Sequence, residues 1–313
     1  MTCMEVWGGN RVVDSSVVLA GLDAWVYSRP FGDSSEGGDV YYVSSCATGR
    51  ITRLLVADVS GHGASVGEVA TGLRQLMRRF VNHIDQARFV RAMNGEFAEM
   101  SRNGGFATAV VTTFFAPTNR LSLCNAGHPV PLHYVAAEGR WRLLESGGRT
   151  ESADSADAPA NLPLGILDLS DYDQFDVTLA LGDLVLCYTD SLIESCGTDA
   201  CTMLGQRGLL DVVNGMDIGD PATFIARLQA KLAEICPANL TNDDVTVLLF
   251  RANGGAPNTP VKERVLAPFR VAREVLRSFL RRDHAAPLPE LSVANIGGNV
   301  VPSLGKVGTK AGK

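Results

Sequence analysis

Strand-like and helix-like segments come in blocks along this chain rather than in strict alternation. Runs rich in β-branched and aromatic residues fill residues 22–56, helical periodicity follows over residues 66–100, and strand-like runs return from residue 106. A further helical pattern covers residues 221–235, and a last strand-like run covers residues 243–251. Single alternation of strand and helix would favour a parallel sheet, whereas blocks of strands favour two facing sheets with helices outside. We therefore expect an α+β fold in which two antiparallel β-sheets face each other, flanked by helices, as an α-β-β-α sandwich.

Two apolar runs, "FDVTLAL" and "DLVLCYT", meet at Gly182 and Asp183. A glycine next to an aspartate between such runs is typical of a tight turn. The sequence therefore predicts a β-hairpin across these two residues.

The chain divides by composition into five parts. Residues 1–20 are expected to be a loose N-terminal lead-in, and residues 21–253 to form the folded domain. The stretch 254–260 has the Gly, Pro and Asn content of a linker. Residues 261–283 carry an apolar stripe on one helical face and arginines on the other, and residues 284–313 have the composition of a disordered tail.

Charge is distributed unevenly between the folded domain and the C-terminal part. The chain has a formal net charge of −6, but residues 254–313 hold ten Lys/Arg and four Asp/Glu, so the preceding residues carry −12. An acidic domain argues against nucleic acid as a partner. The opposite charges favour docking of the basic segment on this domain or on a second copy in a homodimer. A partner protein is less favoured, and an anionic membrane is the least favoured cover for the apolar stripe.

Nothing in the sequence indicates a membrane span or an export signal. No apolar stretch approaches the roughly 18 residues of a membrane span, and the N-terminus lacks a basic region followed by an apolar one. The seven cysteines include no CxxC pair, and several lie in apolar strand-like runs, as buried reduced thiols do. These features predict a cytoplasmic protein.

Aspartates stand at the ends of strand-like runs in four distant parts of the chain. Asp39 precedes "VYYV", Asp58 ends "LLVAD", Asp190 follows "LVLCYT", and Asp243 with Asp244 precedes "VTVLLF". One such residue alone is most often a turn aspartate. Four that meet at one sheet edge would repel one another unless they were protonated or bound to cations, and hard divalent cations prefer such all-oxygen sites. The pattern therefore indicates a site for magnesium or manganese.

Seven motifs occur in an order that is characteristic of one family. They are "GGDVYY", "DVSGHG", "FATAVV", "NAGHP", "LPLG", "GDLVLCYTDSLIE" and "NDDVTVLLF". In this order they resemble bacterial metal-dependent serine/threonine protein phosphatases of the SpoIIE and RsbU type, part of the type 2C (PPM) superfamily. The resemblance covers roughly residues 20–253. It implies a β-sandwich flanked by helices, which the order of segments predicts independently.

The resemblance also implies which oxygen atoms bind metal ions. Asp39 of "GGD" resembles a metal-bridging ligand, and Asp58 of "DVSGHG" resembles the second, with the backbone carbonyl of Val59 reaching one ion. Asp190 of "YTDSLIE" and Asp243 of "NDDVT" resemble the ligands from the later strands. Such a site holds two Mn2+ or Mg2+ ions, and its glycines let backbone and phosphate approach closely.

The implied reaction is hydrolysis of phosphoserine or phosphothreonine by a water molecule that the two ions activate. His62 is the candidate that protonates the leaving alkoxide, and the alternative is that it braces its turn by hydrogen bonding. Asn125 and His128 are expected to serve the turn and the core, and Arg29 is a candidate phosphate clamp. The family resemblance implies a signalling phosphoprotein as substrate, such as the anti-sigma-factor antagonist of a sigma-factor pathway.

Two departures from the family pattern and one rival chemistry bear on this hypothesis. Tyr42 stands where the family usually has the last aspartate of "GGDFYD", and Ser191 stands where it has the glycine of "TDGLxE". If these changes weaken the site, the alternative is a catalytically weak or inactive PPM-fold regulatory binding protein. A serine hydrolase based on Ser60 and His62 is disfavoured, because neither residue lies in a G-x-S-x-G elbow.

Overall fold

The computed structural model describes residues 3–46, 48–61, 64–83, 85–101, 105–145, 161–167, 170–197 and 202–255. His62 lies outside these residues, as do the predicted helical segment 261–283, the predicted tail 284–313 and all but two residues of the predicted linker 254–260. Most of the expected domain 21–253 is described, together with most of the first 20 residues.

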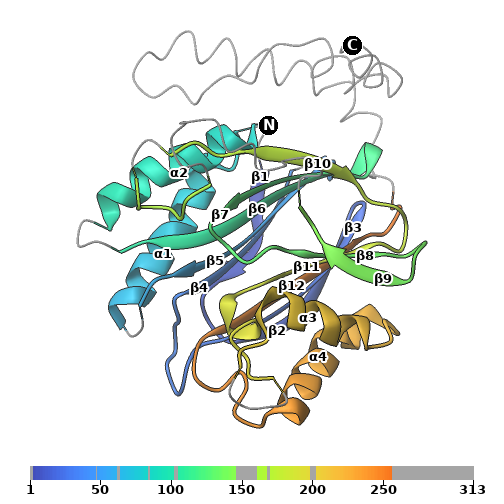
Figure 1. Ribbon diagram of the computed structural model, residues 1–313. Coiled ribbons are helices and arrows are strands. Elements are labelled where there is room, and N and C mark those ends of the chain that lie inside the picture. Colours follow the sequence, from blue (N-terminus) through green and yellow to red (C-terminus); the bar gives the residue numbers. More distant parts are fainter. Residues whose placement is uncertain are drawn as a thin grey trace, which may run out of the picture.

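In these described ranges, twelve strands form two six-stranded antiparallel sheets (Figure 1). Sheet A has the strand order β1-β4-β5-β6-β7-β10, and sheet B has the order β2-β3-β12-β11-β8-β9. The strands of sheet A are β1 (Cys3–Gly9), β4 (Asp39–Cys46), β5 (Ile51–Val59), β6 (Ala107–Phe115), β7 (Arg120–Ala126) and β10 (Gln174–Thr178). Those of sheet B are β2 (Val13–Leu19), β3 (Leu22–Arg29), β12 (Val245–Ala252), β11 (Leu184–Tyr188), β8 (Leu132–Val135) and β9 (Arg140–Leu143).

Helices cover the outer face of each sheet (Figure 1). The pair α1 (Ala64–Phe80) and α2 (Gln86–Met100) packs on sheet A, and the pair α3 (Gly205–Asn214) and α4 (Pro221–Ile235) packs on sheet B. The carboxylate of Asp85 accepts the backbone N–H of Arg88 and so caps α2, while Asp220 caps α4 in the same way. Two short 3-10 turns, η1 (Ala116–Thr118) and η2 (Asp190–Leu192), complete the described elements.

Three apolar layers hold the sandwich together. Tyr42 and Phe97 belong to the layer between sheet A and its helices, Phe114 and Phe250 to the layer between the sheets, and Phe224 to the layer between sheet B and its helices. All five side chains are buried, and burial of such apolar area is the main stabilising contribution in a folded domain. The expected α+β fold, with two facing antiparallel sheets flanked by helices, is confirmed.

The expectation of a loose lead-in over residues 1–20 is wrong. Residues 3–9 and 13–19 form β1 and β2, which are the edge strands of sheets A and B. The serines of β2 made it resemble a loop, but this strand pairs along its length with β3, so its backbone groups are satisfied while its polar side chains are exposed. The folded domain therefore begins at β1.

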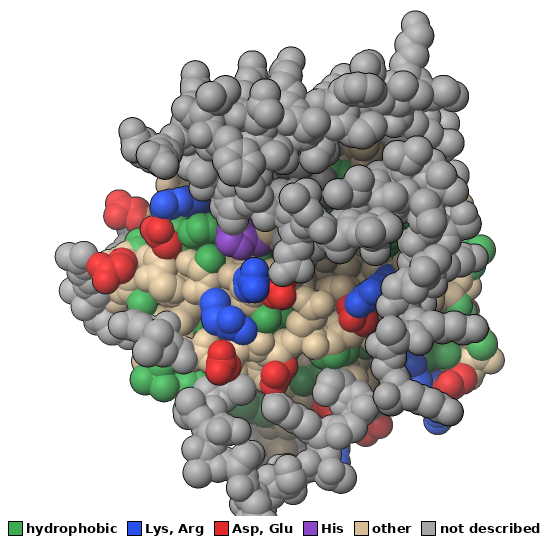
Figure 2. Space-filling view, turned by 90° about the horizontal axis from the view of Figure 1, so that it is seen from above, with side chains coloured by type: hydrophobic (Ala, Val, Ile, Leu, Met, Phe, Trp, Pro, Cys, Tyr) green, Lys and Arg blue, Asp and Glu red, His purple; other side chains and the backbone are tan. Residues whose placement is uncertain are grey.

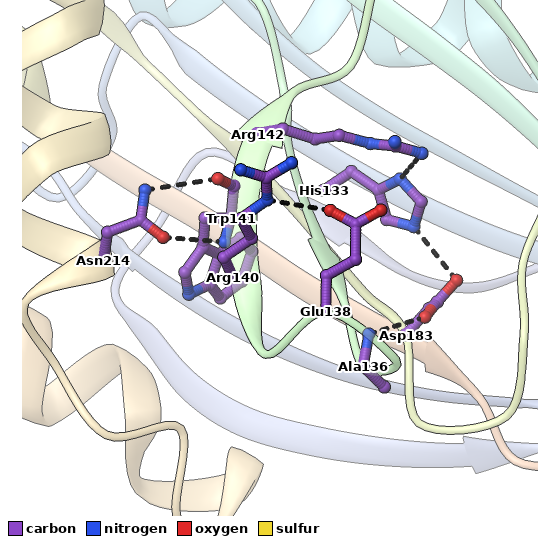
Figure 3. Close-up of polar contacts among 8 residues, drawn as sticks. All are labelled: His133, Ala136, Glu138, Arg140, Trp141, Arg142, Asp183 and Asn214. Carbon is purple, nitrogen blue, oxygen red and sulfur yellow. Dashed lines mark hydrogen bonds and ion pairs between the residues drawn. The ribbon is translucent and has the colours of Figure 1, made fainter.

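The predicted hairpin across Gly182 and Asp183 is also wrong. β10 pairs with β7 in sheet A, whereas β11 pairs with β8 and β12 in sheet B, so the chain passes between layers at this turn. Asp183 is almost fully buried and directs the turn (Figure 3): its carboxylate accepts the backbone N–H of Ala136 at 2.9 Å and lies 3.1 Å from Nε2 of His133. It also accepts the backbone N–H of Ala180 at 2.9 Å. The turn has the residues of a hairpin, but the carboxylate of Asp183 binds His133 and Ala136 in and just after the neighbouring strand β8.

The surface carries mixed charge on the face that Figure 2 shows. There the described Lys and Arg side chains lie beside Asp and Glu side chains. Exposed ion pairs of the described residues include Arg79 with Glu96 at 2.9 Å. None of the helices in the described ranges has the length and apolar character to cross a membrane.

Candidate metal centre

Asp39 and Asp58 lie opposite each other at one end of sheet A. Asp39 is the first residue of β4, and Asp58 is the last residue but one of β5. The register of this antiparallel pair makes them direct cross-strand partners. Side chains of such partners project from the same face of a sheet, with Cβ atoms roughly 5 Å apart. The sequence placed both at strand ends, and the structure brings them together.

Asp190 and Asp243 come to the same end of the sandwich from sheet B. Asp190 opens the 3-10 turn two residues after the end of β11, and Asp243 stands two residues before β12. Since β11 and β12 are antiparallel neighbours, the end of one strand meets the start of the other. A hydrogen bond links the two sheets at this end, because the hydroxyl of Thr189 donates to Oδ2 of Asp39 at 2.8 Å.

Burial and mutual repulsion raise the pKa values of these carboxyl groups. The pKa of Asp58 is raised to about 7, first by burial and then by the charges of Asp190 and Asp243. That of Asp190 is raised to about 6 by burial, followed by Glu194 and Asp243. Burial also raises the pKa of Asp39 well above its usual range, and the charge of Asp58 adds to this effect. Carboxylates from both sheets therefore share one electrostatic environment, which a bound cation would stabilise.

The backbone carbonyl of Val59 lies against a glycine that leaves it uncovered. A Cβ atom on Gly38 would stand 2.9 Å from this carbonyl oxygen and 2.9 Å from Cγ1 of Val66, closer than any side chain tolerates. The N–H of Val59 in turn donates to the carbonyl of Gly38 at 3.3 Å. Glycine at position 38 is therefore required for the start of β4 to pass this close to the end of β5.

The donor set fits a hard divalent cation in chemistry. It consists of carboxylate oxygens and one backbone carbonyl, the ligands that Mg2+ and Mn2+ prefer. Within the described ranges, no three His, Cys, Asp or Glu side chains lie close enough together to coordinate an ion directly. The structure thus gathers the donors at one end of the sandwich without arranging them in a coordination sphere.

Asp244 has a positioning role that the sequence did not assign to it. Its Oδ1 accepts the backbone N–H of Phe31 at 2.6 Å, and its Oδ2 accepts those of Gly38 at 2.5 Å and Asp39 at 3.4 Å. This carboxylate therefore fixes the segment that enters β4 and carries Asp39. The only signal in the sequence was the doubled aspartate "DD", which does not say which of the two carboxylates binds the backbone.

The two departures from the family pattern lie differently with respect to this site. Tyr42 is fully buried in the layer beneath α1, on the face of β4 opposite to that of Asp39, so it does not take a place among the carboxylates. Ser191 is buried beside Asp190, and it is not among the residues with positive φ. The backbone at this position therefore does not require the glycine of the family pattern.

Three further candidates are engaged in structural contacts. The guanidinium of Arg29 donates to the carbonyl of Leu240 in the loop before β12, so the structure shows it bracing that loop. Asn125 exchanges hydrogen bonds with the backbone of His128 at 2.8 and 2.7 Å. His128 is buried, its Nδ1 lies 2.8 Å from the hydroxyl of Thr108, and burial lowers its pKa to about 3. Asn125 and His128 serve the turn and the core, as expected.

Thr189→Val is expected to weaken binding of Mn2+ about 10-fold or more, as removal of groups that orient metal ligands commonly does. Valine keeps the shape of the buried side chain but removes the hydroxyl that orients Asp39 and accepts the N–H of Thr246 at 3.0 Å. Isothermal titration with Mn2+ measures the change. Thr189→Ser retains the hydroxyl and serves as the matched control, so equal losses in both variants would contradict this role.

Comparisons with known proteins give one family by sequence and a shared fold by structure. The sequence model described as stage II sporulation protein E (SpoIIE) matches residues 48–253. The fold is similar to the RsbU and RsbW domains of a Mycobacterium tuberculosis protein, with a TM-score of 0.61 and 24% identity over 85% of this chain and 71% of that one. It is similar to the PP2C phosphatase domain and regulatory fragment of SpoIIE from Bacillus subtilis, with a TM-score of 0.59 and 16% identity over 76% and 64% of the two chains. The SiaA-PP2C domain of Pseudomonas aeruginosa gives a TM-score of 0.56 and 20% identity over 73% and 85%.

Proposed function

The chain belongs to the SpoIIE family of PPM-type phosphatases, and we propose on this premise that it is a metal-dependent protein serine/threonine phosphatase. One observation carries the proposal. Asp39 and Asp58 from sheet A meet Asp190 and Asp243 from sheet B at one end of the sandwich. A turn needs only one aspartate, so a structural role does not explain why carboxylates from four distant parts of the chain lie at one end of the sandwich.

Each residue of the site has a proposed task. Asp39, Asp58, Asp190 and Asp243, with the carbonyl of Val59, would hold two Mg2+ or Mn2+ ions. These ions would supply an activated water and neutralise charge on the phosphoryl oxygens. A crystal structure of the similar protein RsbX contains magnesium, which supports a divalent cation here.

The remaining steps fall to the protein itself. Thr189 and Asp244 hold Asp39 and its backbone in place, so the ligand enters the site in a fixed orientation. No protein nucleophile is needed for a direct attack by water on phosphorus. We assign the proton donor for the leaving alkoxide to His62, with bracing of the turn as its alternative role.

The proposed substrate is a phosphorylated signalling protein. The similar M. tuberculosis structure carries an RsbW domain beside its RsbU domain, which favours a substrate from such a regulatory pathway, for example an anti-sigma-factor antagonist. We place this activity in the cytoplasm and propose a homodimer or intramolecular docking for the basic segment 261–283. Neither a nucleic acid nor a membrane is part of the proposal.

A weak or inactive binding protein is the alternative function. The observation that favours it is the open arrangement of the carboxylates, of which no three are close enough to coordinate an ion within the described ranges. The two functions differ in turnover. A binding protein would retain a phosphopeptide in the presence of Mn2+ without releasing inorganic phosphate.

Metal removal is expected to abolish turnover. The purified full chain should hydrolyse a phosphothreonine peptide in Mn2+, lose at least about 100-fold of this rate when EDTA is added, and recover it when excess Mn2+ returns, because the water is activated only by bound ions. Release of inorganic phosphate measures the rate. Turnover that persists in EDTA would rule out the metal-dependent chemistry, and absence of turnover with retained Mn2+ binding would favour the alternative.

A further inference from the structure

Two cysteines face each other at the far end of sheet A from the carboxylates. Cys3 is the first residue of β1, and Cys46 is the last residue of β4. The antiparallel register pairs them directly, so their side chains project from the same face. Both thiols are free in the structure, and Cys3 is partly exposed while Cys46 is buried.

The hydrogen bonds show which kind of cross-strand pair this is. In a hydrogen-bonded pair, the N–H of Cys3 would donate to the carbonyl of Cys46. Instead, that N–H donates to Oδ1 of Asn82 at 3.1 Å, and the carbonyl of Cys46 accepts the N–H of Gly49 at 2.8 Å. The two cysteines therefore form a non-hydrogen-bonded pair, in which the Cα atoms are about 4.5 Å apart and the side chains are closest. This spacing falls within the range of about 4.4–6.8 Å that disulfides require.

A buried cation lies beside this pair. Arg53 is 3% exposed and forms no ion pair with any residue that the structure describes. Its guanidinium lies over the ring of Phe89 at 5.1 Å and reaches Oε1 of Gln86 at 3.5 Å. The pKa of the Cys3 thiol is raised, first by burial and then by Cys46, and the charge of Arg53 offsets only part of this rise. A thiolate on Cys3 would thus form next to an unpaired positive charge.

Cys46 is held in position by its own turn. Its Sγ accepts the backbone N–H of Ile51 at 3.2 Å and lies 3.0 Å from the hydroxyl of Thr48. Both contacts belong to the turn between β4 and β5, on the other side of β4 from β1, so the sulfur must give them up to bond with Cys3. The other described cysteines have no such cross-strand cysteine partner: Cys124, for example, is paired with Val111 and Gln174.

We propose that Cys3 and Cys46 are a redox-active dithiol, which hydrogen peroxide or a similar peroxide converts to an intramolecular disulfide. The partly exposed Cys3 thiolate attacks a peroxide oxygen, the O–O bond breaks, and the products are Cys3 sulfenic acid and, after protonation, water. Cys46 then attacks the Cys3 sulfur, forms the S–S bond and releases the second water. The two thiols lose two electrons and two protons, and one peroxide is reduced.

The disulfide would fasten an edge strand that carries contacts to α1. Glu5 of β1 forms ion pairs with Arg74 and Arg78 of α1. An edge strand is otherwise held by one neighbour only, so β1 is free to separate from the sheet more readily than a central strand. The S–S bond closes a long loop between the first and fourth strands, and such cross-links stabilise a fold mainly by restricting the unfolded chain.

Peptide mapping of the full chain tests the proposal. The folded protein is treated with hydrogen peroxide, its remaining thiols are alkylated, and it is digested with trypsin without reduction. The tryptic peptides 1–11 and 12–50 each contain one cysteine, Cys3 and Cys46 respectively. They should appear as one linked species, two hydrogen masses lighter than their sum, and separate again after dithiothreitol. The oxidised protein should also melt at least about 5 °C higher than the reduced protein.

Two controls make the result specific. Cys236→Ser changes another partly exposed cysteine and should leave both the linked peptide and the higher melting temperature in place, whereas Cys3→Ser should abolish both. The same oxidation in denaturant should distribute links among all seven cysteines. The proposal is overturned if folded protein loses other thiols while peptides 1–11 and 12–50 stay unlinked, or if the link forms without raising the melting temperature.

Discussion

Asp58→Asn is expected to lower the Mn2+-dependent phosphatase rate by at least about 10³-fold, equivalent to about 4 kcal/mol of transition-state stabilisation. Asp58 is the cross-strand partner of Asp39 and lies near the carboxylates of Asp190 and Asp243. Asp58 is therefore the residue at which the carboxylates of sheet A come near those of sheet B. Asparagine keeps the size of the side chain but removes a negative ligand, so both binding of the cation and activation of water should fail.

The same variant should remain folded. Asp58 adds a negative charge to a cluster of like charges in a partly buried place, and neutral asparagine removes this repulsion. The melting temperature without metal is therefore expected to be no lower than that of the unchanged protein. Asp176→Asn is the matched control, because Asp176 lies on the edge strand β10 and pairs with Arg120 at the surface. The metal assignment is wrong if Asp58→Asn keeps a rate within about threefold of the control.

The sequence predicted the layers of the fold better than its connections. Blocks of strand-like and helical segments were enough to predict the sandwich, and the Asp220-Pro221 start made α4 begin where expected. The layer change at Asp183 was not predictable, because the turn residues are the same whether the next strand returns to its neighbour or crosses to another sheet. What decides is a buried contact with His133, which lies 50 residues away. The lead-in was misjudged since a polar edge strand such as β2 carries little apolar periodicity.

The site was predicted as a set of residues but not as an arrangement. Strand-end position pointed to Asp39, Asp58, Asp190 and Asp243, and the register of β4 with β5 confirms that the first two are neighbours. The sequence could not show which residues hold these four carboxylates in place. Thr189 reaches Asp39 across the gap between the sheets, a contact between residues 150 positions apart. No local sequence pattern predicts a contact between residues so far apart.

The second large effect on the phosphatase rate is expected for Asp244, the second of the two aspartates before β12. Asp244→Ala is expected to reduce the rate about 10²-fold or more although Asp244 is not a proposed ligand. Alanine leaves the backbone N–H groups of Phe31, Gly38 and Asp39 without their acceptor, and unpaired polar groups of this kind destabilise the local structure by about 1–3 kcal/mol each when they are buried. The segment that carries Asp39 would then move away from Asp58.

Tight packing against Gly37 explains why no other side chain can replace the carboxylate of Asp244. A Cβ atom on Gly37 would stand 2.5 Å from Oδ2 and 2.7 Å from Cγ of Asp244, so the backbone and the carboxylate are already in contact. Gly37→Ala should therefore displace the same carboxylate and lower the rate in the same direction, while all ligands keep their chemistry. Agreement between the two variants would identify position, rather than charge, as the contribution of Asp244.

Comparison with Asp243 separates a positioning residue from a ligand. Asp243→Ala should remove Mn2+ binding from titration curves, whereas Asp244→Ala should bind Mn2+ more weakly but still saturate, with a lower rate at saturation. Asp244→Asn keeps one oxygen acceptor of the original two and should fall between Asp244→Ala and the unchanged protein. If Asp244→Ala instead loses binding as completely as Asp243→Ala, then Asp244 is itself a ligand. In that case, the three backbone N–H groups that donate to its carboxylate would lose these hydrogen bonds when a cation binds.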